Sequence, residues 1–182
     1  MTRLEVYRHD DPDHLLASSE DTGEIAARLG EVGIRFERWT AARAVAPTDS
    51  PADVLETYRA DLDRLVAAGG YQKVDVVRMA PDHPDREALR KKFLFEHRHT
   101  EDEVRVFVAG AGLFSLHLGD TVYEVLCCQG DLISVPANTP HWFDMGPRPS
   151  FVAIRLFTDP KGWVAHGTGS DLADRFHRYE GG

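Results

Sequence analysis

The fold of this chain is indicated most clearly by a short run near its middle, His97-Arg98-His99-Thr100-Glu101-Asp102-Glu103. His97 and His99 are two residues apart, so on a strand both side chains project from the same face. Glu103 can return to that face if the chain turns tightly after His99. A further histidine, His141, follows in Pro136-Ala137-Asn138-Thr139-Pro140-His141. Three imidazoles and a carboxylate suit a divalent transition metal such as Fe, Ni or Mn. Four protein ligands on a six-coordinate ion leave positions open, which favours a reaction centre over a structural site.

The sequence around this run has the pattern of an all-β unit. From residue 93 onward, short apolar stretches alternate with Gly, Asp, Asn and Pro, which is typical of strands separated by turns. We expect strands at 93–99, 104–109, 112–118, 122–127, 131–135, 141–144 and 151–157. Closely spaced strands of this kind predict a sandwich or a jelly-roll barrel.

The first 92 residues mix strand and helix signals. Strands are predicted at 4–8, 34–40 and 74–79, and helices between Asp21 and Gly33, from Ser50 to Gly69, and at 84–92. Ser50 before Pro51 combines a cap with a proline at the first helical position. We predict a mainly β fold, a barrel with an N-terminal α/β extension. It would be a single domain over 1–182, with the extension at 1–92, the barrel core and metal site at 93–158 and a C-terminal tail at 159–182.

The bulk properties exclude several classes of protein. The chain has 182 residues and a formal net charge of −9, which disfavours nucleic acid and anionic membranes as partners. No 18-residue apolar run is present, and the first residues lack the apolar region of a signal peptide. The cysteines, Cys127 and Cys128, are neighbours and so unsuited to bridging each other. We therefore expect a reduced, cytoplasmic protein.

Two motifs frame the predicted barrel: His97-x-His99-x3-Glu103-x6-Gly110 and Gly130-x5-Pro136-x-Asn138-x2-His141. Together they resemble the paired signatures of the cupin superfamily, whose barrel holds a metal on three histidines and a glutamate. Asn138 stands where glycine is common, but asparagine also tolerates a positive φ. The resemblance implies a cupin jelly-roll barrel.

Within the cupins, the chain resembles the acireductone dioxygenase family of the methionine salvage pathway. The stretches that carry this resemblance are 93–105, 135–146 and 154–157, and chain length and the helical N-terminal part agree with it. It implies one Fe(2+) or Ni(2+) per chain and a reaction of O2 with the enediol 1,2-dihydroxy-3-keto-5-methylthiopentene. The Fe form would give formate and 2-keto-4-methylthiobutyrate. The Ni form would give formate, CO and 3-methylthiopropionate.

The resemblance also implies roles for individual residues. The metal ligands would be His97, His99, Glu103 and His141. The catalytic candidates are Arg105, Glu96 and Asp102, and the substrate-pocket candidates are Phe93, Phe143 and Trp163. Arg105 follows Glu103 by two residues, so on a strand it points toward the site and could stabilise a substrate dianion. A structural salt bridge is the alternative for Arg105, and solvated strand ends are the alternative for Glu96 and Asp102.

Other functions fit the same ligand set. A flavonol-type dioxygenase or a sugar isomerase could use it, and so could a sensory cupin that binds metal without turnover. No basic DNA-reading helix accompanies the motifs, which disfavours a transcriptional regulator. We expect a monomer whose partners are the small-molecule enediol and O2.

Overall fold

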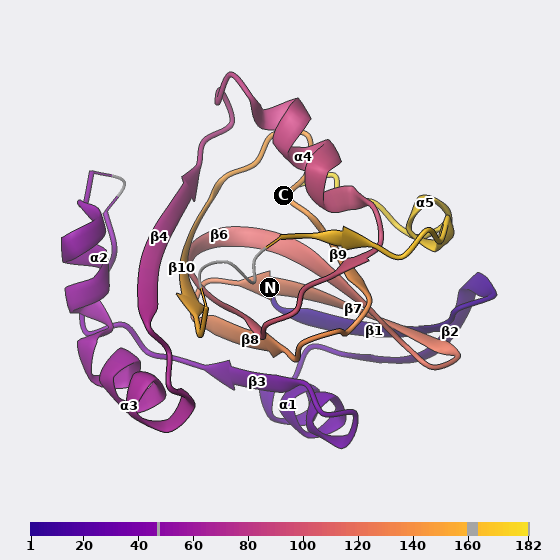
Figure 1. The fold of residues 1–182 in the computed structure, drawn as a ribbon, viewed down its shortest axis with the longest axis horizontal. Coiled ribbons are helices and arrows are strands. Elements are labelled where there is room, and N and C mark those ends of the chain that lie inside the picture. The colour runs from indigo at the N-terminus through magenta and orange to yellow at the C-terminus, as the bar shows by residue number, and fades with distance from the viewer. Residues whose placement is uncertain (47, 160–163, 182) are drawn as a thin grey trace.

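The computed structural model describes residues 1–46, 48–159 and 164–181. Its strands form two sheets that share one long strand, β6 (Glu103–Leu118), as Figure 1 shows. The first half of β6 pairs with β8 (Asp131–Val135) and β10 (Phe151–Phe157). Its second half pairs with β7 (Thr121–Cys128) and β9 (His141–Asp144). Because β6 belongs to both sheets, they wrap around a common core, and the predicted mainly β barrel is confirmed.

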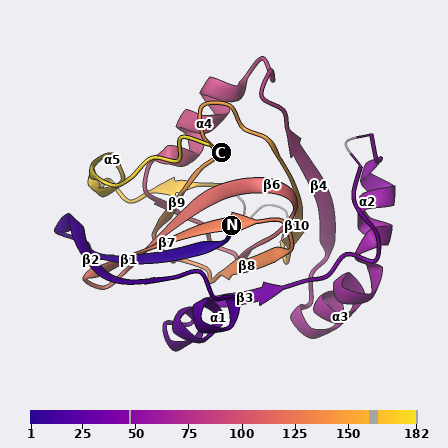
Figure 2. The same ribbon diagram turned by 180° about the vertical axis from the view of Figure 1, so that it is seen from behind.

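The first third of the chain adds strands to both sheets. β1 (Arg3–Arg8) pairs with β7 and with β2 (Asp11–Ser19), and these strands are seen side by side from behind in Figure 2. β3 (Arg35–Arg38) pairs with β8, and β4 (Lys73–Met79) pairs with β10. β2 was not predicted, because most of its side chains are exposed and it lacks apolar alternation. The predicted division of the chain into an extension (1–92), a barrel core (93–158) and a tail (159–182) stays a prediction.

The two strands predicted at 104–109 and 112–118 are one continuous strand, so that prediction was wrong. Gly110 lies at the junction with a φ of +71°, and a Cβ there would lie 1.8 Å from the carbonyl oxygen of Ser150. Only glycine fits this close approach. The sequence predicted a turn at Gly110. In the structure this glycine instead marks the point at which β6 passes from one sheet to the other.

The helices lie outside the barrel (Figure 1). They are α1 (Thr22–Glu31), α2 (Pro51–Thr57), α3 (Arg59–Gly69), α4 (Arg86–Leu94) and α5 (Leu172–Arg175). The caps at Asp21 and Ser50 are confirmed, because each side chain accepts a backbone N–H three residues on. The single helix predicted from Ser50 to Gly69 is instead broken at Tyr58, whose buried ring packs against Trp39. No helix in the described ranges is long and apolar enough to cross a membrane.

The segment that leads into the metal motif also differs from its prediction. A strand was expected at 93–99, but α4 continues to Leu94 and only β5 (His97–Arg98) is extended and paired. β5 has β9 on one side and β11 (His166–Gly167) on the other. β11 was not predicted, because a two-residue strand leaves no periodicity in the sequence.

Candidate metal centre

Three histidines converge at the edge of the barrel. His97 on β5 is the register partner of His141 on β9, and His99 follows β5 directly. These side chains are buried, and their potential ligand atoms all lie within 4.8 Å of one another. The predicted convergence of the three histidines is therefore present.

Glu103 reaches the same centre from the start of β6. Its Oε2 lies 3.2 Å from Nε2 of His99 and 3.0 Å from Nε2 of His141. The carboxylate is 3% exposed. Glu103 returns to the histidines because the chain turns between His99 and β6, as the sequence analysis required.

The outer nitrogens of the three rings each face a backbone carbonyl. The Nδ1 atoms lie 2.7 Å from Phe95 O (His97), 3.2 Å from Val164 O (His99) and 2.8 Å from Thr139 O (His141). A carbonyl only accepts hydrogen bonds, so each Nδ1 carries the proton and each neutral ring has its lone pair on Nε2. Second contacts of this kind hold metal-binding histidines in orientation.

This arrangement fits a cation at the centre. With Nδ1 protonated, the Nε2 lone pairs of His99 and His141 face a carboxylate oxygen, so a proton or a metal ion has to lie between them. His97 favours the neutral, ligating form, because burial and the neighbouring His141 lower its pKa to about 4. Imidazole nitrogens and a carboxylate oxygen are ligands suited to Fe, Ni or Mn.

Arg105 is held next to Glu103 inside an aromatic box. Its Nε lies 2.6 Å from Glu103 Oε1, and its guanidinium carbon lies 5.0 Å from the Phe143 ring, 5.6 Å from Phe114 and 5.9 Å from Phe93. Burial lowers the pKa of Arg105 from its ordinary value, while Glu103 opposes that shift. Burial would raise the pKa of Glu103, but the charge of Arg105, together with the adjacent His141 and His99, holds it well below its ordinary value. Arg105 therefore forms a buried salt bridge and also lies beside the candidate metal centre, so both interpretations of this residue remain.

Glu96 is buried and is not a solvated strand end, whereas Asp102, directly before β6, is partly exposed. Glu96 is 3% exposed, and its carboxylate accepts hydrogen bonds from Thr168 at 2.5 Å and from His117 at 2.8 Å. Asp102 is half-buried and accepts the backbone N–H of Ala137 at 2.9 Å. Both carboxylates contact residues that surround the three histidines, and their catalytic roles stay predictions.

The loop before His141 has the backbone shape expected from its motif. Among the described residues, Asn138 is the one non-glycine with a positive φ, at 63°, and its N–H donates to the carbonyl of His99. This bond fastens the second motif to the first. The departure from glycine at this position is therefore tolerated, as predicted.

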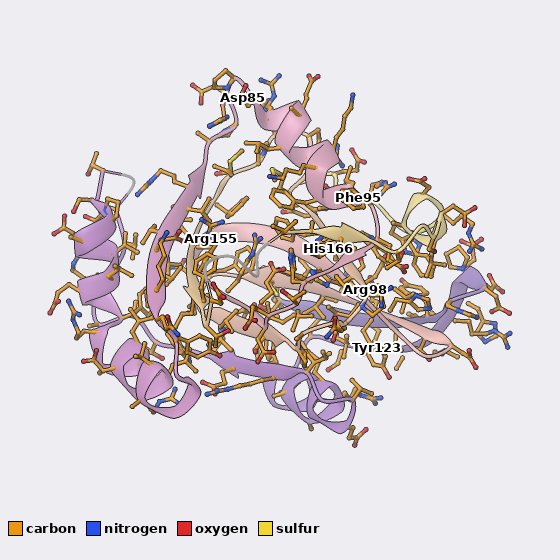
Figure 3. The ribbon with its side chains drawn as sticks, viewed as in Figure 1. Asp85, Phe95, Arg98, Tyr123, Arg155 and His166 are labelled. Carbon is orange, nitrogen blue, oxygen red and sulfur yellow. The ribbon has the colours of Figure 1, made fainter. Side chains whose placement is uncertain are left out.

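The pocket candidates are only partly placed. Phe143 is buried and Phe93 is half-buried on α4, while Trp163 lies outside the described residues. The sequence did not single out Phe114, because an apolar residue at an inward position of a strand looks the same whether it lines a site or only fills the core. It also missed Arg155, which is the register partner of Arg105 and makes a two-point ion pair with Asp75. Figure 3 labels Arg155 to the left of Arg98 and His166.

Comparisons with known proteins agree on one family. Residues 3–165 match the model of the ARD/ARD′ family. The chain is 57% identical to an acireductone dioxygenase of Stenotrophomonas maltophilia (strain K279a), over 98% of this chain and 97% of that protein. It is 56% identical to one from Alcanivorax borkumensis, over 97% and 98%. A solved structure, the acireductone dioxygenase from Bacillus anthracis with a cadmium ion in its active centre, superimposes with a TM-score of 0.78 at 28% identity, covering 91% of this chain and 98% of that one.

Proposed function

This chain belongs to the ARD/ARD′ family, and from that premise we propose that it is a metal-dependent acireductone dioxygenase of methionine salvage. Its substrate is the enediol 1,2-dihydroxy-3-keto-5-methylthiopentene, which it cleaves with O2. The observation that carries this proposal is the buried group of three imidazoles and one carboxylate at the barrel edge.

One Fe(2+) or Ni(2+) per chain is held by His97, His99, His141 and Glu103. Support comes from the three Nδ1 contacts with carbonyls, which leave Nε2 of each ring as the ligating atom. When bound, the ion supplies Lewis acidity, which stabilises the negative charge of a chelated enediol. We also propose that the chain acts as a monomer. Cys127 and Cys128 are free, which agrees with a reducing cytoplasm.

Arg105 stabilises the second negative charge of the substrate dianion. Its guanidinium lies next to the metal-binding carboxylate and is 5% exposed. A fixed cation in a site shielded from water interacts with developing charge far more strongly than one in solvent. Phe93, Phe114 and Phe143 surround the guanidinium and shield it from water.

The metal, and not the polypeptide, selects the products. The Fe form gives formate and 2-keto-4-methylthiobutyrate, and the Ni form gives formate, CO and 3-methylthiopropionate. The proposed ligand set contains no thiolate that would favour one ion. Ni(2+) binds such sites more tightly than Fe(2+), so metal supply decides which form is present in the cell.

Reconstitution of one apoprotein with each metal tests the proposal. Both forms should consume O2 in the presence of the enediol, and headspace analysis should find CO from the Ni form alone. O2 consumption without CO from either form would leave a dioxygenase with a single outcome. No O2 consumption by either form would contradict the proposal and favour an isomerase or a sensory cupin.

A further inference from the structure

We propose that Thr168 is a positioning residue for the metal centre, which fastens the C-terminal segment 164–168 onto the ligand strand β5. We call this segment the clasp. The inference rests on the proposed function, because it concerns the same metal ligands. The family match ends at residue 165, so β11 and Thr168 lie beyond it.

β5 needs support because it is short. It contains two residues, and its pairing with the barrel is limited to the register pair His97 and His141. On its other side, β11 pairs His166 with Arg98 and Gly167 with His97. Figure 3 labels His166 and Arg98. An edge segment with so few ladder bonds frays readily, so β11 supplies much of the order at the first ligand.

The clasp also holds the second ligand. The carbonyl of Val164 faces Nδ1 of His99 at 3.2 Å, which fixes that nitrogen as the protonated one. Val164 is four residues from Thr168. If the clasp separates from β5, His99 loses the contact with the Val164 carbonyl that directs its Nε2 lone pair to the metal centre.

Thr168 closes the clasp through Glu96, the residue immediately before His97. The Thr168 N–H donates to the Glu96 carbonyl at 3.1 Å, and the Thr168 hydroxyl donates to Glu96 Oε1 at 2.5 Å. Glu96 Oε2 faces Nδ1 of His117 on β6 at 2.8 Å. The buried carboxylate therefore joins the clasp, the ligand strand and the barrel wall at one point.

The hydroxyl of Thr168 can be removed without creating a buried cavity. Thr168 is only half-buried, and Thr168→Val keeps its shape and its backbone N–H. A buried carboxylate that loses one of its donors is left short of hydrogen bonds, which favours opening of the clasp. Loss of an outer contact to a metal ligand typically weakens metal binding about 10- to 100-fold.

The test measures release of Cd²⁺, the ion present in the Bacillus anthracis relative. Each variant is loaded with Cd²⁺ and mixed with excess EDTA, and the release rate is followed beside a melting curve. We expect Thr168→Val and Thr168→Ala to release the ion about tenfold faster or more. Thr168→Ser, which keeps the hydroxyl, should release it close to the wild-type rate. In the Cd²⁺ form, the ¹⁵N signals of the His99 ring should shift in the Val and Ala variants only.

Thr2→Val is the matched control. The Thr2 hydroxyl donates to the buried Asp131 carboxylate at the same length, 2.5 Å, away from the metal centre. This variant should lose stability without faster release. Wild-type release from Thr168→Val, equally fast release from Thr2→Val, or failure of serine to rescue would overturn the clasp while leaving the metal site intact. A wild-type protein that takes up no Cd²⁺ would instead overturn the proposed metal site.

Discussion

Two buried carboxylates near opposite ends of β8 have very different surroundings. Asp131 begins β8, and Glu103 on β6 is the register partner of Val135, which ends it. Asp131 accepts the Thr2 hydroxyl at 2.5 Å and the Cys128 N–H at 2.7 Å, and the half-exposed Arg38 lies 3.0 Å away. Glu103 instead faces two imidazole nitrogens and a buried arginine.

The pKa directions of the two carboxyl groups differ accordingly. Burial raises the pKa of Asp131, and its neutral donors and Arg38 offset this only in part. The pKa of Glu103 is held well below its ordinary value despite burial, chiefly by the Arg105 charge. A buried carboxylate satisfied by neutral donors and a half-exposed arginine stabilises the fold. One that faces lone pairs and a fixed cation is prepared for a further positive ion.

The largest effect should come from removing the charge at Glu103. We expect Glu103→Gln to weaken metal binding by more than about a hundredfold, because a neutral amide is a poorer ligand than a carboxylate. Elemental analysis of the purified variant measures the loss. Asp131→Asn is the matched change near the other end of β8 and should retain a full metal complement. Equal metal content in the two variants would show that the difference between the carboxylates is not functional.

Arg105 should affect the rate and not the metal. We expect Arg105→Ala to keep its metal and to turn over about 100- to 1000-fold more slowly, as when a charge-stabilising donor is removed from an active site. Arg105→Lys should recover part of the rate, since it keeps the charge but not the planar fork. Steady-state rates with spectroscopic titration of the bound substrate measure both effects. A normal rate and normal dianion formation in the alanine variant would reduce Arg105 to a structural salt bridge.

Asp131 should affect stability and not the reaction. Asp131→Ala leaves the Cys128 N–H and the Thr2 hydroxyl without their acceptor, which costs about 1–3 kcal/mol of unfolding free energy. Urea unfolding of the metal-loaded protein measures this cost, and the rate per metal-loaded chain should be unchanged. A variant with wild-type stability but a lower rate would reverse the roles assigned to the two carboxylates.

The smallest effect concerns the pH dependence of stability. The pKa of Asp131 is raised from its ordinary value of 3.8 in the folded protein, so as pH rises through 3.8 the unfolded chain releases this proton first. The unfolded state is then favoured increasingly until the folded pKa is reached. The unfolding free energy of wild type minus that of Asp131→Asn should therefore fall with pH across this window. A difference that is flat or rises with pH would contradict the direction of the shift.

The sequence predicted the site better than its surroundings. His97 and His99 could be placed because a spacing of two puts both side chains on one face of an extended segment. The convergence of Glu103 and His141 with them was implied by the resemblance of the two motifs to the cupin signatures. The caps at Asp21 and Ser50 were predictable from local capping patterns, and the positive φ of Asn138 from its position in the second motif. Two contacts could not be predicted from any local pattern, because they join residues far apart in the sequence. Val164 contacts His99 over 65 residues, and Thr168 contacts Glu96 over 72. The burial of Glu96 and the continuity of β6 through Gly110 likewise depend on partners distant in sequence.

O2 consumption by the Fe(2+)-loaded protein tests the central claim most directly. Wild type, Glu103→Gln and Asp131→Asn would be compared in one oxygen-electrode experiment with the same enediol. We expect wild type and Asp131→Asn to consume O2 at similar rates, and Glu103→Gln to show no uptake above the metal-free background. Uptake by Glu103→Gln at the wild-type rate, or no uptake by the wild type, would contradict the account.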